Sequence, residues 1–213
     1  MLFSPQFGWP VGVLGGGELP AELARTWLES AAIRIAADGG ANHFLRLGIR
    51  PDWVVGDFDS ATPEALGMAH YQRHIPAQDS TDCDKLLALA EELKLQQMVL
   101  LGAEGDRLDH TIGTLMSVAR SGLDVRILLR TGWAKPLIPG EYEVHTTVGT
   151  TVSLLPLGES VLESRGLRWE IGETPMSPGG LVSVSNEVRE SPVHLIIRQG
   201  LVALFVLESA PHH

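Results

Sequence analysis

The stretch from Arg34 to Ser60, RIAADGGANHFLRLGIRPDWVVGDFDS, largely determines the fold that the sequence predicts. It contains two short apolar runs, Arg34 to Ala37 and Trp53 to Val55, and each run leads into a turn that contains Gly and Asp. The segment between the runs is long enough for one crossover helix. A strand, a helix and a second strand in this order are typical of a parallel sheet.

The same alternation extends through the N-terminal part of the chain, where segments of helical period fill the gaps between apolar runs. Further strands are expected at Val11 to Leu14, Met98 to Leu101 and Val125 to Leu129, and helices at Pro20 to Glu29, Asp82 to Leu93 and Leu108 to Ala119, with another helix beginning at Thr62-Pro63-Glu64. We therefore expect residues 1–132 to form an α/β domain, an open and mostly parallel sheet flanked by helices.

The pattern changes after Thr131, where Gly132, Pro136, Pro139 and Gly140 interrupt any regular element. Beyond them, β-branched runs recur at short intervals with turn residues between them. Strands are expected at Val144 to Leu155, Val161 to Ser164, Leu181 to Ser185 and Val193 to Leu207, the last folded as a hairpin over Gln199-Gly200. Residues 133–213 should thus form a smaller antiparallel, sandwich-like β domain that needs no helix.

Composition excludes several classes of protein. The formal net charge of -10 disfavours a nucleic-acid surface, because phosphate backbones are bound by clustered Lys and Arg. The chain has one cysteine, Cys83, so it has no internal disulfide, which fits a reducing compartment. It also lacks an apolar run of the ~20 residues that a membrane helix needs, and a basic, then apolar N-terminus. We expect a cytoplasmic protein that binds neither nucleic acid nor a membrane.

Two acidic turns follow neighbouring predicted strands. Asp38 and Asn42 come after the first run of the opening stretch, and Asp57 and Asp59 come after the second. The carboxyl ends of strands are where ligands bind in open α/β sheets. Carboxylates that converge there suit Mg²⁺, which completes its shell with water and phosphate oxygens. The alternative is that these residues only cap helices or form Asx turns, but their placement on one predicted edge favours the metal site.

Two further clusters begin predicted helices. Thr81, Asp82 and Lys85 form the first, and a lysine beside exposed N–H groups and carboxylates is suited to a polyphosphate. The second follows the Gly-rich turn after Leu101 and contains Arg107, Asp109 and His110, where Arg107 can grip a phosphate with two hydrogen bonds. Alternatively, Ser80 or Thr81 caps the first helix with Asp82 and Asp84 in its first turn, and Asp109 caps the second helix with His110 as an exposed helical residue. The chain has no P-loop lysine motif and no Gly-x-Ser-x-Gly elbow.

In the order and spacing of these motifs, the sequence resembles the thiamine pyrophosphokinase family. The motifs that carry the resemblance are Asp38-Gly39-Gly40-Ala41-Asn42, Gly56-Asp57-Phe58-Asp59-Ser60, Ser80-Thr81-Asp82 with Lys85, Arg107-Leu108-Asp109-His110, Gly166-Leu167-Arg168-Trp169 and Ser185-Asn186-Glu187. The resemblance spans nearly the whole chain. It implies an α/β catalytic domain, a C-terminal β domain, and a homodimer whose thiamine sites lie between subunits.

The resemblance also implies roles for individual residues. Asp57, Asp59 and Asp82 would hold Mg²⁺ and the phosphates of ATP, with Asp38, Asn42, Thr81, Asp109 and His110 in the same nucleotide site. Lys85 and Arg107 would neutralise charge on the transferring groups. Ser185 and Asn186 would hydrogen-bond the thiamine pyrimidine, and Trp169 would either pack near it or serve as a core aromatic residue. The implied reaction is in-line attack of the thiamine hydroxyl on the β-phosphorus of ATP, with AMP leaving.

The chain departs from the family pattern at two places. It has Asp106 where the family usually has Gly, and Val188 and Arg189 where an aromatic residue often follows the Ser-Asn pair. An extra carboxylate repels phosphate unless it turns away, and a missing aromatic removes a stacking surface. These departures leave open a Mg²⁺-dependent phosphotransferase or pyrophosphotransferase that acts on another small alcohol. A non-catalytic protein that binds a nucleotide or thiamine is the other alternative.

Overall fold

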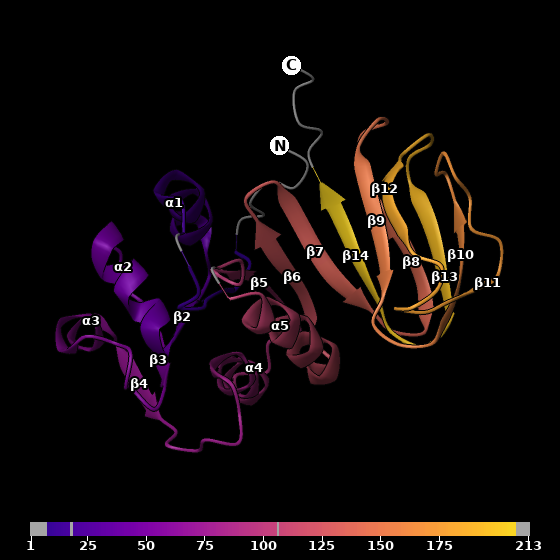
Figure 1. The fold of residues 1–213 in the computed structure, drawn as a ribbon. Helices are drawn as coiled ribbons and strands as arrows, with labels where there is room; N and C mark the ends of the chain where they lie inside the picture. The colour runs from indigo at the N-terminus through magenta and orange to yellow at the C-terminus, as the bar shows by residue number, and fades with distance from the viewer. Residues whose placement is uncertain (1–7, 18, 106, 208–213) are drawn as a thin grey trace. The chain divides into compact units, whose positions relative to one another are not determined.

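A computed structural model describes residues 8–17, 19–105 and 107–207 of the chain (Figure 1). Asp106, at which the sequence departs from the family pattern, lies outside these described residues. The chain divides into two compact units, and the division in the described part falls between Arg130 and Thr131. In the described residues no helix is both long enough and apolar enough to span a membrane.

The first unit is built on a parallel sheet. Its strands are β1 (Val11–Val13), β2 (Arg34–Ala37), β3 (Trp53–Gly56), β4 (Tyr71–His74), β5 (Gln97–Leu101) and β6 (Asp124–Leu129). Their order is β6-β5-β1-β2-β3-β4, and every neighbouring pair runs parallel. The expected open parallel sheet is therefore confirmed. The chain extends the sheet from β1 to β4 and then returns to β5 on the other side of β1, which makes the β1 end a topological switch point.

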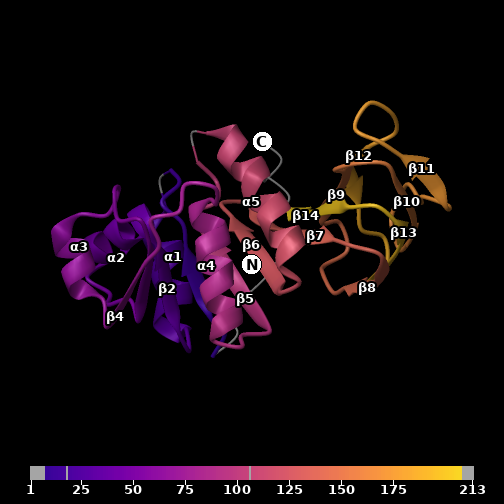
Figure 2. The same ribbon diagram turned by 90° about the horizontal axis from the view of Figure 1, so that it is seen from below.

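Helices connect these strands and cover the sheet. They are α1 (Ala21–Ser30), α2 (Ala41–Leu47), α3 (Pro63–Met68), α4 (Asp82–Glu92) and α5 (Leu108–Ser121), with a 3-10 turn, η1, at Asp38–Gly40. Because crossover connections are right-handed, the reversal at β1 puts α4 and α5 on the face opposite to the earlier helices. Figure 2 shows α4 and α5 side by side. Trp27, Phe44 and Leu86 bring the helices' apolar faces into the core, where they are fully buried.

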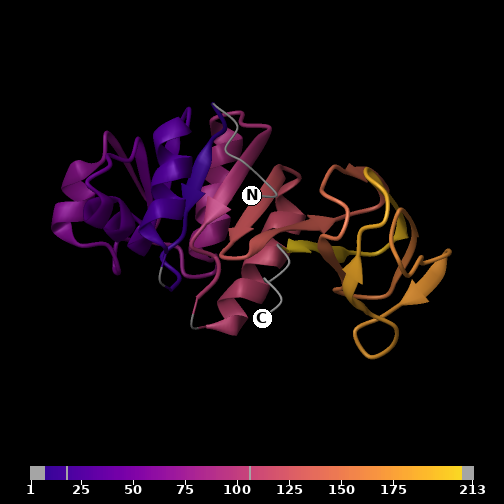
Figure 3. The same cartoon turned by 90° about the horizontal axis from the view of Figure 1, so that it is seen from above.

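The second unit is a β-sandwich. Its strands are β7 (Gly132–Leu137), β8 (Gly140–Val144), β9 (Thr151–Pro156), β10 (Ser160–Arg165), β11 (Thr174–Met176), β12 (Ser183–Glu187), β13 (Val193–Gln199) and β14 (Val202–Leu207). They form antiparallel layers in the orders β12-β9-β14-β7 and β11-β10-β13-β8. One hydrophobic cluster combines Leu154 and Leu204 from the first layer with Leu162 and Leu195 from the second. Figure 3 shows the described part of this unit as strands and loops alone, as expected.

Several details of the expected β domain were wrong. The predicted hairpin over Gln199-Gly200 does not form, because β13 pairs with β8 and β10 whereas β14 pairs with β7 and β9. β13 and β14 each bury one face in the same core, so the short connection at residues 200–201 leads from one layer of the sandwich to the other. The single strand expected at Val144 to Leu155 is broken from His145 to Thr150. β7 and β8 occupy the stretch that was expected to be irregular, with Pro136 inside β7.

Candidate active site

Three carboxylates converge at the carboxyl edge of the parallel sheet. Asp38 lies in η1 directly after β2, and Asp57 and Asp59 follow β3, the neighbouring strand. Each residue offers one carboxylate oxygen such that these atoms all lie within 4.8 Å of one another. The sequence placed the two acidic turns on one edge, and the structure shows that they meet there. The predicted metal set was Asp57, Asp59 and Asp82, whereas the group of converging carboxylates in the described residues consists of Asp38, Asp57 and Asp59.

Asp38 is the most enclosed member of this group, with 1% of its surface exposed. Its carboxylate accepts hydrogen bonds from the backbone N–H groups of Ser60 and Ala61, both at 3.2 Å. Burial, followed by the contact with Asp59, raises the pKa of Asp38, and the bonds from residues 60 and 61 only partly offset this. Gly56 makes room for Asp38, because a Cβ on Gly56 would lie 2.8 Å from the Asp38 Cβ.

Lys85 reaches the cluster from the first turn of α4. Its side chain is only 3% exposed, and its Nζ lies 3.3 Å from Asp57 Oδ2 and 3.9 Å from Asp82 Oδ1. Burial of the Asp57 carboxylate opposes ionisation, but hydrogen bonds from Lys85 and Gln78 outweigh it and hold the pKa of Asp57 below its usual value. A buried lysine must be paired, and here the carboxylates of the cluster are its partners.

Asp82, in the first turn of α4, is affected both by burial and by the neighbouring carboxylates. Burial, followed by the charge of Asp38, raises the pKa of Asp82; Lys85 opposes this, and Asp57 and Asp59 add to the rise. The side chain remains 45% exposed, so a ligand can reach it. A bound cation would relieve the repulsion that these carboxylates exert on one another.

Two neighbours of Asp57 were not anticipated from the sequence. Gln78 Nε2 donates to Asp57 Oδ2 at 2.8 Å, and His74 Nε2 lies 3.2 Å from the Asp57 carbonyl oxygen. Both come from β4 or the loop after it. β4 was not predicted because all its residues are exposed and no apolar run marks it. The sequence signal for these two neighbours is their position: the segment that connects β3 to α4 has to pass the end of β3, where Asp57 lies.

Asn42 and Thr81 support the turns. Asn42 Nδ2 donates to the carbonyl oxygen of Ser60 at 2.9 Å, and its Oδ1 accepts from the N–H of Thr62 at 2.9 Å, which ties α2 to the loop after β3. Thr81 is the N-cap of α4 in a capping box with Asp84. Asp84 also pairs with Arg120 at 3.0 Å. Thr81 therefore has the capping role that was considered as the alternative for this cluster.

Arg107, Asp109 and His110 lie at the start of α5. Arg107 Nη2 and Asp109 Oδ2 are 2.6 Å apart, and the two side chains are 68% and 65% exposed. His110 is also exposed. These side chains are open to solvent, so the guanidinium can turn from Asp109 to an anionic ligand at little cost.

The remaining predicted residues lie in the β-sandwich. Asn186 in β12 is buried, whereas Ser185 beside it is exposed and has a positive φ of 57°. Ser185 donates its N–H to Ser153 Oγ at 3.0 Å. Trp169, in the loop after β10, is 56% exposed, which contradicts the alternative that it is a core aromatic residue. The Asn186 side chain bonds the Trp169 backbone at both its N–H and its carbonyl oxygen.

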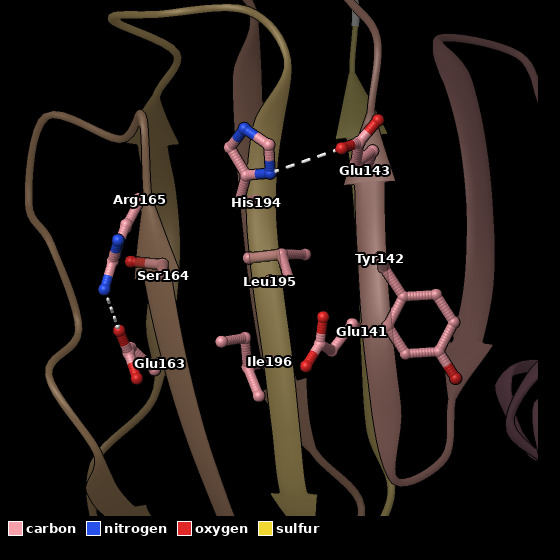
Figure 4. Close-up of a pocket in the computed structure, with 9 residues that line it drawn as sticks. All are labelled: Glu141, Tyr142, Glu143, Glu163, Ser164, Arg165, His194, Leu195 and Ile196. Atoms are coloured by element: carbon pink, nitrogen blue, oxygen red, sulfur yellow. Dashed lines mark hydrogen bonds and ion pairs between the residues drawn. The ribbon is translucent and has the colours of Figure 1, made fainter.

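A separate hollow of about 440 Å³ lies on β8, β10 and β13 of the sandwich (Figure 4). Two pairs of its side chains lie close together, Arg165 with Glu163 at 3.1 Å and His194 with Glu143 at 3.7 Å. It contains none of the residues singled out from the sequence. The acidic edge of the first unit is therefore the stronger candidate for chemistry.

Comparisons with known proteins agree on one family. The family model of the thiamin pyrophosphokinase catalytic domain matches residues 24–129, and that of the vitamin B1 binding domain matches residues 141–202. Thiamine pyrophosphokinase 1 of Oryza sativa subsp. japonica is 30% identical, over 86% of this chain and 82% of the relative. Thiamine pyrophosphokinase of Bacillus subtilis (strain 168) is 24% identical, over 80% of this chain and 85% of the relative.

Solved structures have the same fold. Thiamin pyrophosphokinase from Candida albicans superposes with a TM-score of 0.80 at 17% identity, over 98% of this chain and 96% of that chain. The crystal structure of thiamine pyrophosphokinase from Bacillus subtilis gives a TM-score of 0.79 at 22% identity, over 94% of this chain and 100% of that chain.

Proposed function

The chain belongs to the thiamine pyrophosphokinase family, and from this premise we propose that its acidic edge binds Mg²⁺ and ATP to transfer a pyrophosphoryl group to thiamine. The products are thiamine diphosphate and AMP. The observation that carries the proposal is the convergence of Asp38, Asp57 and Asp59 within 4.8 Å at the switch-point edge of the sheet. We assign the α/β unit, up to Arg130, to ATP and Mg²⁺, and the β-sandwich, from Thr131 on, to thiamine.

The carboxylates fit a magnesium ion by their chemistry. Mg²⁺ prefers hard oxygen ligands, and it commonly takes one or two carboxylates together with phosphate oxygens. The group supplies Asp57 and Asp59 as such ligands, with Asp82 and Asp38 beside them. Burial is the main cause of the raised pKa values of Asp38 and Asp82, and the neighbouring carboxylates add to it, which fits a site that a cation would stabilise. Bound Mg²⁺ would neutralise charge on the phosphates during transfer.

The chain's own residues position the reactants. Lys85, fixed between Asp57 and Asp82, adds positive charge next to the phosphates. Arg107 turns from Asp109 to the polyphosphate, and His110 lies beside it. Asn42 and Thr81 hold the two acidic loops in place. In-line attack of the thiamine hydroxyl on the β-phosphorus then needs only orientation and charge neutralisation, while a carboxylate of the cluster takes the hydroxyl proton.

On the thiamine side, Ser185 and Trp169 are the accessible groups of the predicted set. The Ser185 hydroxyl can hydrogen-bond the pyrimidine. The exposed indole of Trp169 can contact the rings of thiamine. The buried Asn186 side chain accepts from the Trp169 N–H and donates to Ser183 Oγ within the sandwich.

Two properties of the whole protein belong to the proposal. A cytoplasmic location agrees with the single cysteine, Cys83, which is buried and free. A homodimer agrees with the exposed apolar side chains of Leu108, Ile112 and Met116, which recur every four residues along α5 and so share one face. Sedimentation at micromolar concentration should give the mass of two chains, and a monomer alone would contradict this part.

The decisive experiment is product analysis. Purified protein is incubated with thiamine, ATP and Mg²⁺, with a metal-free control, and the products are separated by chromatography. Thiamine diphosphate and AMP in equal amounts are expected. ADP with thiamine monophosphate would show phosphoryl transfer instead, and no thiamine product would favour another acceptor alcohol or a binding protein. Parallel reactions with other small alcohols in place of thiamine separate the last two outcomes.

A further inference from the structure

The turn after β3 has a backbone conformation that its own residues disfavour. Phe58, between Asp57 and Asp59, has a positive φ of 66°, and a bulky aromatic residue rarely adopts this left-handed region. Rotation of the peptide between Asp57 and Phe58 changes this φ angle. A free peptide would therefore let Phe58 return to a negative φ and would change how the two carboxylates lie relative to each other. Contacts from outside the turn have to keep the peptide in place.

The far end of the turn is tied to η1 and α2. The carboxylate of Asp38 accepts the N–H groups of Ser60 and Ala61, both at 3.2 Å. Asn42 Nδ2 donates to the carbonyl oxygen of Ser60 at 2.9 Å. These three bonds fix the backbone after Asp59, but they do not involve the peptide that precedes Phe58. The orientation of that peptide depends on contacts at the near end of the turn.

His74, the last residue of β4, contacts both residues of this peptide. Its Nε2 lies 3.2 Å from the Asp57 carbonyl oxygen, and because a carbonyl oxygen can only accept, Nε2–H is the donor. Its ring centroid lies 5.2 Å from that of Phe58, with the two rings tilted by 38°, a separation typical of aromatic pairs. Gly56 lies opposite His74 in the parallel β3–β4 pair, so the strand register brings the imidazole to the start of the turn.

We infer that His74 is a positioning residue of the metal site: its hydrogen bond holds the peptide after Asp57 in the orientation that makes the Asp57 and Asp59 carboxylates converge. The inference rests on the proposed function and adds to it a residue outside the motifs that carry the family resemblance. Gln78 contacts the Asp57 carboxylate itself, at 2.8 Å, whereas His74 acts on the backbone. Removal of a group that orients a metal ligand without touching the metal typically lowers metal affinity or activity by about 10–100-fold.

Three substitutions at His74 separate its hydrogen bond from its ring. His74→Ala, which removes both, should raise the Mg²⁺ concentration for half-maximal rate about tenfold, with the KM for thiamine unchanged. His74→Gln keeps an N–H donor for the Asp57 carbonyl oxygen, so it should restore most of the Mg²⁺ affinity. His74→Phe keeps the ring beside Phe58 without a donor, so it should resemble His74→Ala, and it carries the test if that variant does not fold. Full Mg²⁺ affinity in His74→Phe would overturn the inference.

Gln72→Ala is the matched control in the same strand. Gln72 is exposed like His74, but its Nε2 donates to the carbonyl oxygen of Leu66 in α3, at 2.9 Å, and not to the acidic turn. This variant should leave the Mg²⁺ dependence unchanged. The melting temperatures of Gln72→Ala and His74→Ala should both stay within about 2 °C of the unmodified protein, because β4 has no buried residue. An equal rise in the Mg²⁺ requirement of Gln72→Ala would show that His74 acts only through the integrity of β4, which overturns the inference.

Metal binding can be measured without turnover, so failure of the proposed function is recognised separately. Mn²⁺, which takes the same oxygen ligands as Mg²⁺, is titrated into the full chain, and the free ion is followed by electron paramagnetic resonance. His74→Phe should bind Mn²⁺ about tenfold more weakly than the unmodified protein. Mn²⁺ binding by the unmodified protein without formation of thiamine diphosphate would refute the proposed function alone. Equal Mn²⁺ affinity in the two proteins would refute the role of His74, and no binding to either would refute both.

Discussion

The acidic edge of the α/β unit and the Trp169 loop of the β-sandwich hold their polar groups in opposite ways. At the edge, Asp38, Asp57 and Asp59 bring like charges within 4.8 Å, and the cation that pairs with this group in the described part of the chain is Lys85. In the loop, the side chain of Asn186 has a partner for every donor and acceptor. Both regions contain a non-glycine residue with a positive φ angle: Asp38 and Phe58 at 40° and 66° in the acidic turns, and Ser185 at 57° beside Asn186.

This difference separates two ways of preparing a binding site. The edge stores electrostatic repulsion that a bound cation can relieve, so its structure and its stability should depend on the ligand. The loop is complete without a ligand, so it should bind as a preformed surface. Changes at the edge should therefore affect turnover and metal dependence most, and changes in the loop should affect thiamine affinity.

The largest effect is expected from removal of one charge at the edge. Asp59→Asn keeps the shape of the side chain but removes a hard, charged ligand for Mg²⁺, so turnover should fall by about a thousandfold at saturating substrates. This loss is measured as the rate of thiamine diphosphate formation by Asp59→Asn and by the unmodified protein over a Mg²⁺ titration. Excess Mg²⁺ should not restore the full rate.

Asp84→Asn is the matched control for this change. Asp84 also lies at the start of α4, but its carboxylate is used in the capping box and in the pair with Arg120. Turnover should stay within a few-fold of the unmodified protein, although the melting temperature falls. Comparable loss of turnover in both variants would mean that the edge acts through the integrity of α4 and not through a metal.

Lys85→Met should be the next largest perturbation, this time of stability. It removes the buried cation that lies 3.3 Å from Asp57 and leaves the carboxylates uncompensated, which should lower the free energy of unfolding by about 3 kcal/mol. Urea unfolding with and without Mg²⁺ measures it, and the ion should stabilise the variant more than the unmodified protein. Arg73→Met, which breaks an exposed pair with Glu92, should change stability little. Equal Mg²⁺ effects in the unmodified and Lys85→Met proteins would show that Lys85 and the ion do not share partners.

His43 should give the α/β unit a stability that depends on pH. Burial, and then the charge of Arg46, lowers the pKa of His43 from 6.5 to about 4. Between pH 6.5 and pH 4, His43 is protonated in the unfolded chain but stays neutral in the folded chain. The free energy of unfolding therefore has its full value above pH 6.5 and decreases as the pH falls toward 4. About 2 kcal/mol should disappear between pH 7 and pH 5. Unfolding of His43→Gln over the same range should show a shallower slope, and identical slopes would contradict the assignment.

The sequence predicted the α/β unit better than the β-sandwich for a physical reason. Parallel strands are buried on both faces, so they appear as apolar runs that end in Gly and Asp. β4 was missed because this edge strand has no buried side chain. In the sandwich, the β-branched residues of the loop from Thr146 to Val148 imitate a strand. Strand partners there also depend on contacts distant in sequence, which local patterns cannot specify.

The candidate site shows the same limit. The position of Asp38 and Asp57 followed from the sequence, because a residue directly after a parallel strand must lie at the carboxyl edge. Lys85 was expected near phosphate, but its burial between carboxylates depends on the packing of α4 and could not be read from spacing. The contact of Asn186 with Trp169 spans 17 positions along the chain, and neither residue carries a local signal for it.

The smallest effect is expected where the edge is most exposed, at the pair of Arg107 and Asp109. Asp109→Asn should move the melting temperature by less than about 2 °C, because both side chains lie in solvent. The same change frees the guanidinium, so the KM for ATP should stay equal or fall, whereas Arg107→Ala should lower kcat with the melting temperature unchanged. Thermal melts and ATP titrations of both variants show whether Arg107 acts on ATP or holds the start of α5. A fall of more than about 5 °C in Asp109→Asn would mean that the pair holds the start of α5, which would make Arg107 a structural residue and leave Lys85 as the principal positive charge of the site.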